Sequence, residues 1–319
     1  MAGTSFLLIL PVLALVMVLV DVNYANTESN SLFIESENCL HVFQDLESNI
    51  PHLGRIVLKE EAFDVINSKK PLSDSKKSTK DNLQLKVDQI TQNYNKYGLQ
   101  VNCTVESIKE SNDPFEVEVT STVVVQKDKV SHQRILRQKI SINDPNDPLP
   151  DPMPIVKCYE YGGASINGSR IYYGHSLASY LEQRGEKNWA LYENASSPLF
   201  IKKCPYDPFV GHGDPVTLET LKNCLDNGFY HESNDGACYL CRLEGKSTCL
   251  HQGLEIFIIP PPTYNQSDSA PCSVDHVIFG ENGSDIYPGG SIQYHQEGAL
   301  IFQLFLDDSH RKKYGLPRI

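Results

Sequence analysis

Residues 1–20 read MAGTSFLLILPVLALVMVLV, and no charged side chain occurs among them. Residues 6–20 are apolar throughout. Twenty helical residues rise about 1.5 Å each and reach about 30 Å, which is the thickness of the hydrocarbon core of a bilayer. The stretch predicts a transmembrane or assembly helix at residues 1–22, and it decides in which compartment the remaining chain lies.

A cleaved secretory signal is the alternative interpretation of this stretch. Such signals begin with basic residues and end at a small-residue cleavage site. Here the leading MAGTS has no Lys or Arg, and residues 21–25 (DVNYA) offer no A-x-A pattern. We therefore expect a retained, single-pass anchor in the cell membrane. The cysteines and glycosylation sequons then favour an extracellular position for residues 21–319.

Length and charge limit the classes of function. A chain of 319 residues with 40% hydrophobic residues is expected to form two domains beyond the anchor. Its formal net charge is −12. Nucleic-acid binding requires a basic face, so we exclude nucleic acid as a partner.

Cysteines and sequons support export. Exported chains use cysteines for disulfide bonds because export compartments are oxidising. The nine disulfide candidates are Cys39, Cys103, Cys158, Cys204, Cys224, Cys238, Cys241, Cys249 and Cys272. An odd count leaves at least one thiol unpaired or paired between chains. The five Asn-x-Ser/Thr sequons, which predict a glycoprotein, are at Asn102, Asn167, Asn194, Asn265 and Asn282.

Residues 23–143 change from helical to strand periodicity. Apolar residues continue at helical spacing over residues 32–53, where Pro51 is expected to weaken or end the helix. A second helical stripe covers residues 83–97. Over residues 101–142 the apolar positions alternate, which indicates a three-stranded antiparallel meander. The pattern predicts a helical spine followed by a sheet.

Cys39 and Cys103 are the two cysteines of this first module. Cys39 lies on the apolar seam of the predicted spine, and Cys103 lies on the inward face of the first strand. We expect them to form a disulfide bond, which would stabilise the module by about 2–4 kcal/mol. Two buried thiols are the alternative.

A proline-rich linker precedes a second domain. Residues 144–154 contain five prolines in eleven positions, and proline fixes φ, so this segment predicts a semi-rigid spacer and a domain boundary. Residues 155–319 are expected to form a separate, disulfide-containing, Cys-rich extracellular α+β domain. Its expected elements are helices at 175–183 and 214–228 and strands at 171–173, 254–259, 274–279, 291–295 and 299–306.

One cluster in the second domain has residue types that bind metals. Its members are His231, Cys238, Cys241, Cys249 and His251. The CxxC spacing occurs in zinc knuckles, in redox pairs and among structural disulfides. Because no second CxxC is present and glycines flank the first, we favour disulfides and assign no cofactor; zinc is the metal alternative. No catalytic residue is assigned, since nothing in the sequence fixes the mutual geometry of His175, His212 and His295.

The anchor also carries a family resemblance. FLLILPVL at residues 6–13, followed by apolar residues to Asp21, resembles the N-terminal segment of TadE-like pseudopilins, in which Leu-Pro lies near the start of the apolar segment and an acidic residue near its end. The order of apolar helix, helical continuation and antiparallel sheet is similar to that of archaeal type IV pilin-like proteins. The resemblance implies a membrane-held subunit whose N-terminal helix packs into a filament or secretion assembly.

These observations predict a membrane-anchored, extracellular structural or adhesive protein of the cell surface, suited to be a minor or tip subunit of a pilus-like assembly. Expected partners are the membrane, other filament or surface subunits, and a glycan or cell-surface ligand. We expect no enzymatic activity. The alternative is an anchored extracellular metal-dependent or hydrolytic enzyme that uses the His/Cys cluster at 212–276.

Overall fold

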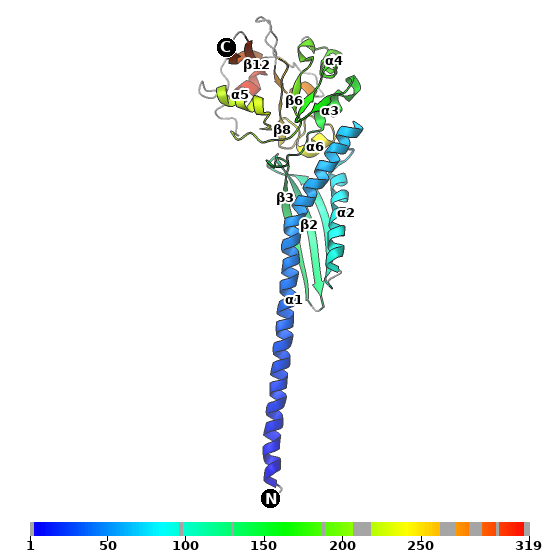
Figure 1. The fold of residues 1–319 in the computed structure, drawn as a ribbon, viewed down its shortest axis with the longest axis vertical. Coiled ribbons are helices and arrows are strands. Elements are labelled where there is room, and N and C mark those ends of the chain that lie inside the picture. Colours follow the sequence, from blue (N-terminus) through cyan, green and yellow to red (C-terminus); the bar gives the residue numbers. More distant parts are fainter. Residues whose placement is uncertain are drawn as a thin grey trace.

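The computed structural model describes residues 3–95, 98–128, 130–186, 189–206, 218–261, 272–280, 289–297 and 300–315. A long helix, α1 (Gly3–Ser68), runs beside a three-stranded sheet and continues far beyond its lower end, while the C-terminal half forms a head at the opposite end (Figure 1). Helices and antiparallel sheets occur together, which confirms the α+β class.

The α1 helix does not end at Pro51, so of the two effects expected of this proline, the end of the helix is wrong. Proline inside a helix costs about 3 kcal/mol, because it removes one hydrogen bond and crowds the preceding turn. On either side of Pro51 the helix buries Leu46, Ile50, Val57 and Leu58 completely. Each such side chain contributes about 1.5–3 kcal/mol when buried, so packing outweighs the proline and the helix continues to Ser68.

The expected meander is present. It consists of β1 (Gln100–Glu110), β2 (Glu116–Lys127) and β3 (Val130–Ser141), paired antiparallel in the order β1-β2-β3. The alternation of the sequence sets its two faces, since every second residue of β1 and β2 is buried over most of their length. The α1 helix packs on β3 and β2, and α2 (Ser75–Asn95), which is the second expected helix, packs on β1 (Figure 1).

Cys39 and Cys103 are both buried in the core between these helices and the sheet. Cys103 pairs with Val123, which pairs with Arg134 of β3, and the Arg134 guanidinium lies over the ring of Phe43, one turn after Cys39. The two cysteines therefore lie at a similar level of the core. Their disulfide bond stays a prediction.

The head consists of short elements. Its helices are α3 (Met153–Cys158), α4 (His175–Gln183), α5 (Leu218–Asn227), α6 (Tyr239–Leu243), α7 (Asp275–Phe279) and α8 (Asp308–Lys313), with 3-10 turns η1 (Tyr159–Tyr161) and η2 (Trp189–Tyr192). Its strands are β4 (Ser165–Asn167), β5 (Arg170–Tyr172), β6 (Ser196–Pro198), β7 (His231–Ser233), β8 (Gly253–Glu255), β9 (Phe257–Ile258), β10 (Ser273–Val274), β11 (Gly289–Glu297) and β12 (Leu300–Asp307).

Most elements expected in the head are found, with one clear error. The helix at 175–183 is α4, and the expected C-terminal hairpin is the antiparallel pair of β11 and β12. The start of the helix expected at residue 214 lies outside the described residues. The strand expected at 274–279 is wrong, because β10 ends at Val274 and α7 follows. The carboxylate of Asp275, the first residue of α7, turns inward there and accepts the Ile256 N–H at 3.3 Å.

The expected anchor lies at the N-terminal end of the stalk, by which we mean α1, α2 and the three-stranded sheet. Among the described residues, no helix combines the length and the hydropathy needed to cross a membrane. The side chains of residues 1–14, which hold most of the expected anchor, lie outside the described part of the chain.

The head and the sheet share one buried cluster. This cluster joins residues of α1, α2 and the sheet to Leu149, Tyr239, Leu240 and Leu243. The backbone N–H of Leu72, in the loop after α1, also donates to the Leu243 carbonyl at 3.0 Å. The α6 helix therefore lies at the junction of the two parts (Figure 1).

Candidate metal centre

Four of the five predicted metal-ligand candidates come together at this junction. Cys238 immediately precedes α6, Cys241 lies within it, and Cys249 and His251 lie in the loop that leads to β8. Their ligand atoms all lie within 4.8 Å of one another. The Nδ1 atom of His251 is 3.5 Å from the Cys238 sulfur and 3.7 Å from the Cys241 sulfur.

Two glycines close the loop that carries these ligands. Leu254 donates its N–H to the Ala237 carbonyl at 3.0 Å, which brings β8 against the start of α6. A Cβ atom at Gly236 would lie 2.2 Å from the Leu254 carbonyl oxygen, and one at Gly253 would lie 2.4 Å from the Gly236 carbonyl oxygen. Only glycine permits this close approach at both positions. The approach keeps Cys249 and His251 close to Cys238 and Cys241.

The donor set is that of a structural zinc site. Three thiolates and one imidazole form a Cys₃His tetrahedron, in which bonds of about 2.0–2.3 Å place the ligand atoms about 3.4–3.8 Å apart. The observed separations of 3.5 and 3.7 Å fall in this range. The Cys238 N–H also donates to the Cys249 sulfur at 3.3 Å, which orients that sulfur. The residues present can therefore hold a metal ion.

The acidity of the three thiols also favours a bound cation. Hydrogen bonding to Cys241 and Cys249 together with burial holds the pKa of Cys238 well above its ordinary value, while the same hydrogen bonds lower the pKa of Cys249. Among the three thiols, Cys249 is therefore the most acidic. Only a bound cation would allow all three to be thiolates at neutral pH.

Two residues outside the head complete the surroundings of His251. The Nε2 atom of His251 lies 2.9 Å from Oε1 of Glu110 at the end of β1, and Glu110 pairs with Lys76 of α2 at 2.6 Å. Metal-binding histidines commonly donate their second ring N–H to a carboxylate, which fixes the tautomer and the orientation of the ring. Glu110 and Lys76 are distant from residues 238–251 in the sequence, and no sequence signal could have identified them.

The fifth candidate, His231, belongs to a different group. It lies in β7 near Cys204 and Cys224, and the ligand atoms of these three buried residues lie within 4.8 Å of one another. The sulfurs of Cys204 and Cys224 are 3.2 Å apart. This pair is well placed for a disulfide bond, which stays a prediction. Cys158 and Cys272 are both buried and stay disulfide candidates without an assigned partner.

The other predicted site residues lie at the surface or outside the described part. Asn102, Asn167 and Asn194 are exposed, as glycan acceptors must be. Asn265 and Asn282 lie outside the described residues, as does His212. His175 pairs with Glu193 at 2.7 Å on the surface, and His295 lies in β11, where side chains are not described.

Arg242, next to Cys241, is fully buried, and the sequence analysis did not identify it. Its Nε and Nη2 atoms donate to Oδ2 of Asp151 at 3.0 and 2.5 Å, and Nη2 also donates to Asp275. Tyr230 donates its hydroxyl to the same Asp151 oxygen at 3.0 Å. This network attaches α6 to the proline-rich segment and to α7.

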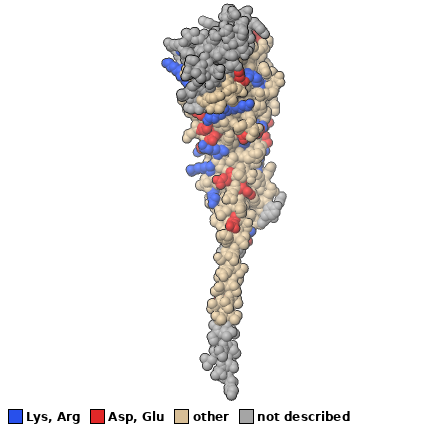
Figure 2. Space-filling view, turned by 60° about the vertical axis from the view of Figure 1, so that its left-hand side comes forward, with Lys and Arg blue, Asp and Glu red and all other residues tan. Residues whose placement is uncertain are grey.

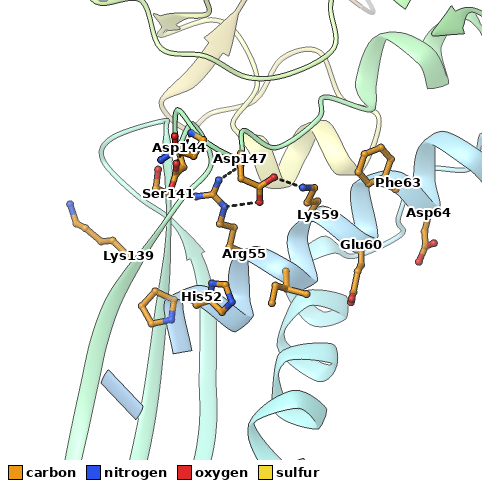
Figure 3. Close-up of a pocket in the computed structure, with 13 residues that line it drawn as sticks. His52, Arg55, Lys59, Glu60, Phe63, Asp64, Lys139, Ser141, Asp144 and Asp147 are labelled. Carbon is orange, nitrogen blue, oxygen red and sulfur yellow. Dashed lines mark hydrogen bonds and ion pairs between the residues drawn. The ribbon is translucent and has the colours of Figure 1, made fainter. Parts of the chain in front are cut away.

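That segment is also fixed to α1, beside a surface groove. Arg55 pairs with Asp144 at 3.0 Å, and both Arg55 and Lys59 bind Asp147 (Figure 3). The groove beneath these pairs, between α1 and the end of β3, has a volume of about 920 Å³. It is lined by polar and charged residues together with the apolar side chains of Pro51, Ile56 and Phe63.

No family model, curated protein or solved structure matches this chain significantly.

Proposed function

We propose that this chain is a membrane-held structural or adhesive protein of the cell surface, which packs its N-terminal helix against lipid and against neighbouring subunits of a pilus-like assembly. The observation that carries this proposal is the part of α1 that extends beyond the sheet and packs on no other described element, which we call the bare part of the helix (Figure 1). Its apolar side chains face solvent: Leu15 is 61% exposed, Leu19 54% and Phe33 64%. A helix that is apolar on all sides is normally covered by lipid or by protein.

The energy at stake is large compared with the stability of a protein. Seven apolar side chains from Leu15 to Val22 are each at least half exposed. Complete burial of such a side chain contributes about 1.5–3 kcal/mol, so covering the exposed half of seven contributes about 5–10 kcal/mol. No Lys or Arg precedes Arg55, and Figure 2 shows a stalk without blue side chains below the sheet. Lipid or another copy of the helix suits this surface.

The role of the metal centre follows from its closed geometry. We infer that it binds zinc, with all four positions taken by Cys238, Cys241, Cys249 and His251. Structural zinc sites have four protein ligands, whereas catalytic sites keep one position open. Since His251 also contacts Glu110 of β1, zinc would fix the head on the stalk. A rigid connection of this kind suits a protein that presents its head away from a membrane.

Substitutions on the bare helix test the proposal. Leu15 and Leu19 lie one turn apart on one stripe, and changing both to Lys would place two charges in the covered surface. Leu85 on α2 is equally exposed, at 61%, and Leu85→Lys is the matched control. We expect wild type and control to sediment with membranes and to resist alkaline extraction, and the double variant to be released. A wild-type chain that remains a soluble monomer without detergent would contradict the proposal.

A further inference from the structure

We propose a second metal site, in the head, where Asp235, Glu255, His276 and His310 bind a divalent transition-metal ion of the zinc class. The four residues come from separate segments: the turn after β7, the end of β8, the start of α7 and the middle of α8. One ligand atom of each lies within 4.8 Å of the others. The site goes beyond the surface-assembly function and shares no residue with the Cys₃His centre.

The distances fit ligands of one ion better than they fit direct contacts. Oε2 of Glu255 lies 3.5 Å from Nδ1 of His276 and 3.5 Å from Nε2 of His310. Oδ2 of Asp235 lies 3.6 Å from Nε2 of His276 and 4.0 Å from Nε2 of His310. An N–H···O hydrogen bond spans about 2.7–3.2 Å, so these contacts are too long. Ligands bound at about 2.0–2.2 Å to a common ion are separated by about 3.3–3.6 Å in a tetrahedron, and the two contacts of Glu255 fall in this range. Glu255 and Asp235 face different ring nitrogens of His276, so a shared ion uses only one of these two nitrogens.

Burial makes the arrangement costly without a ligand. Glu255 is fully buried and His276 is 96% buried, yet neither Oε2 of Glu255 nor either ring nitrogen of His276 has a hydrogen-bond partner. Each buried polar atom without a partner costs about 1–3 kcal/mol. Nδ1 of His276 faces Oε2 of Glu255, so a single ion between them would satisfy both atoms, while Nε2 of His276 faces Asp235.

The neighbouring groups hold the two carboxylates in position. The other oxygen of Glu255, Oε1, accepts from Lys313 Nζ at 2.7 Å and from the Tyr314 hydroxyl. The other oxygen of Asp235, Oδ1, accepts from the Ser233 hydroxyl at 2.7 Å. Each carboxylate therefore has one oxygen fixed by the protein and turns the second toward the site, as is usual around bound metals.

The charge of the site favours a cation, and its access to solvent allows the ion to exchange. Two carboxylates, of Asp235 and Glu255, face the site and only one of them pairs with the Lys313 ammonium, so a divalent cation suits the charge of the site. The Asp235 side chain is 60% exposed, so the site opens to solvent on that side. Imidazole and carboxylate ligands together suit zinc and its first-row neighbours rather than calcium or magnesium. The Cys₃His centre, in contrast, is enclosed by its four ligands.

Metal counting on the full chain in detergent tests this site. The probe is Zn²⁺ alone, followed by Co²⁺, because cobalt bound to thiolates gives strong charge-transfer absorption that cobalt bound to nitrogen and oxygen lacks. We expect two tightly bound ions in wild type. Asp235→Asn, an isosteric change at the exposed member, should weaken binding of one ion by at least about 10-fold and leave the thiolate band unchanged. His276→Gln should do the same.

Glu232→Gln is the matched control, since Glu232 lies three residues away in β7 and pairs with Lys203 instead. Circular dichroism confirms that each variant is folded. A wild-type chain that binds ions only with the thiolate band, or a folded Asp235→Asn variant that binds the second ion as tightly as wild type, would overturn the proposal. Neither result bears on membrane attachment, so the proposed function is tested separately.

Discussion

Replacement of Arg242 by Met tests how the head is held together. Arg242, Asp151 and Asp275 have no exposed side-chain surface, and the guanidinium donates to both carboxylates. Without it, two buried carboxylates face each other with no cation between them. Loss of one member of a buried ion pair costs about 3–5 kcal/mol. Because α6 also carries Cys241, the same change should weaken zinc binding.

The chain provides its own reporter for this loss. Trp189 is the only tryptophan and packs against a buried cluster formed mostly by residues of the head, with Ile66 of α1, so its fluorescence follows unfolding of this region. For a domain of 150–250 residues, 1 kcal/mol shifts Tm by about 2–4 °C, so we expect Tm of Arg242→Met to fall by about 6–20 °C.

Arg55→Met is the control, because Arg55 binds Asp144 and Asp147 on the surface, where the Asp144 side chain is 41% exposed. Exposed pairs contribute about 0–1 kcal/mol, so this variant should shift Tm by about 4 °C at most. Equal shifts in the two variants, or a fall below about 3 °C for Arg242→Met, would show that the buried network does not hold the head together.

Three further predictions concern the junction of head and stalk. Glu244→Gln weakens the acceptor for the Ser75 N–H and hydroxyl, both at 2.9 Å, and should cost about 1 kcal/mol at neutral pH in a urea titration. Burial acts to raise the pKa of Glu244, but its hydrogen bonds with Lys246 and Ser75 lower the pKa below the ordinary 4.5. The stability that Glu244 contributes is therefore complete above pH 4.5 and is lost as the pH falls through the pKa of the folded state. Below that pH the variant and the wild type should be equally stable. Removal of zinc by a chelator should lower the Trp189 transition by about 10 °C or more, and an unchanged transition would exclude a structural ion. Gly253→Ala places Cβ 2.4 Å from the Gly236 carbonyl and should cost about 1–3 kcal/mol and release zinc; a fully stable variant would show that the two strands can separate freely.

The parts of the fold that the sequence predicts correctly depend on short-range periodicity. Alternation over residues 101–142 identifies the meander, and the stripe of residues 83–97 identifies α2, because each pattern directly describes a buried face. The stop expected at Pro51 fails because tertiary packing outweighs a local preference. The strand expected at 274–279 fails because a short apolar run fits a buried helix as well as a strand, and the chain turns into α7 at Asp275.

The candidate site residues also divide into those that lie close together in the sequence, which are predictable, and those that only the fold brings together. Cys238, Cys241, Cys249 and His251 lie within a short segment, so their spacing alone suggests a metal. Glu110, which orients His251, comes from another domain and has no signature of its own.

Charged residues are normally expected at the surface, and so the buried pair of Arg242 and Asp151 is not predictable from composition. The group of Asp235, Glu255, His276 and His310 spans four segments; His310 lies outside residues 212–276, and the sequence analysis considered only the histidines and cysteines of that region.

The central claim is that the apolar N-terminal helix is covered by lipid or by other copies of itself. The most direct measurement is alkaline extraction of native membranes, followed by chemical crosslinking and intact-mass analysis of the chain. Our account predicts that the chain, with residues 6–20 retained, stays in the membrane pellet until detergent is added and crosslinks to partners through the stalk. Recovery of the same chain as a monomer in the detergent-free supernatant would contradict it.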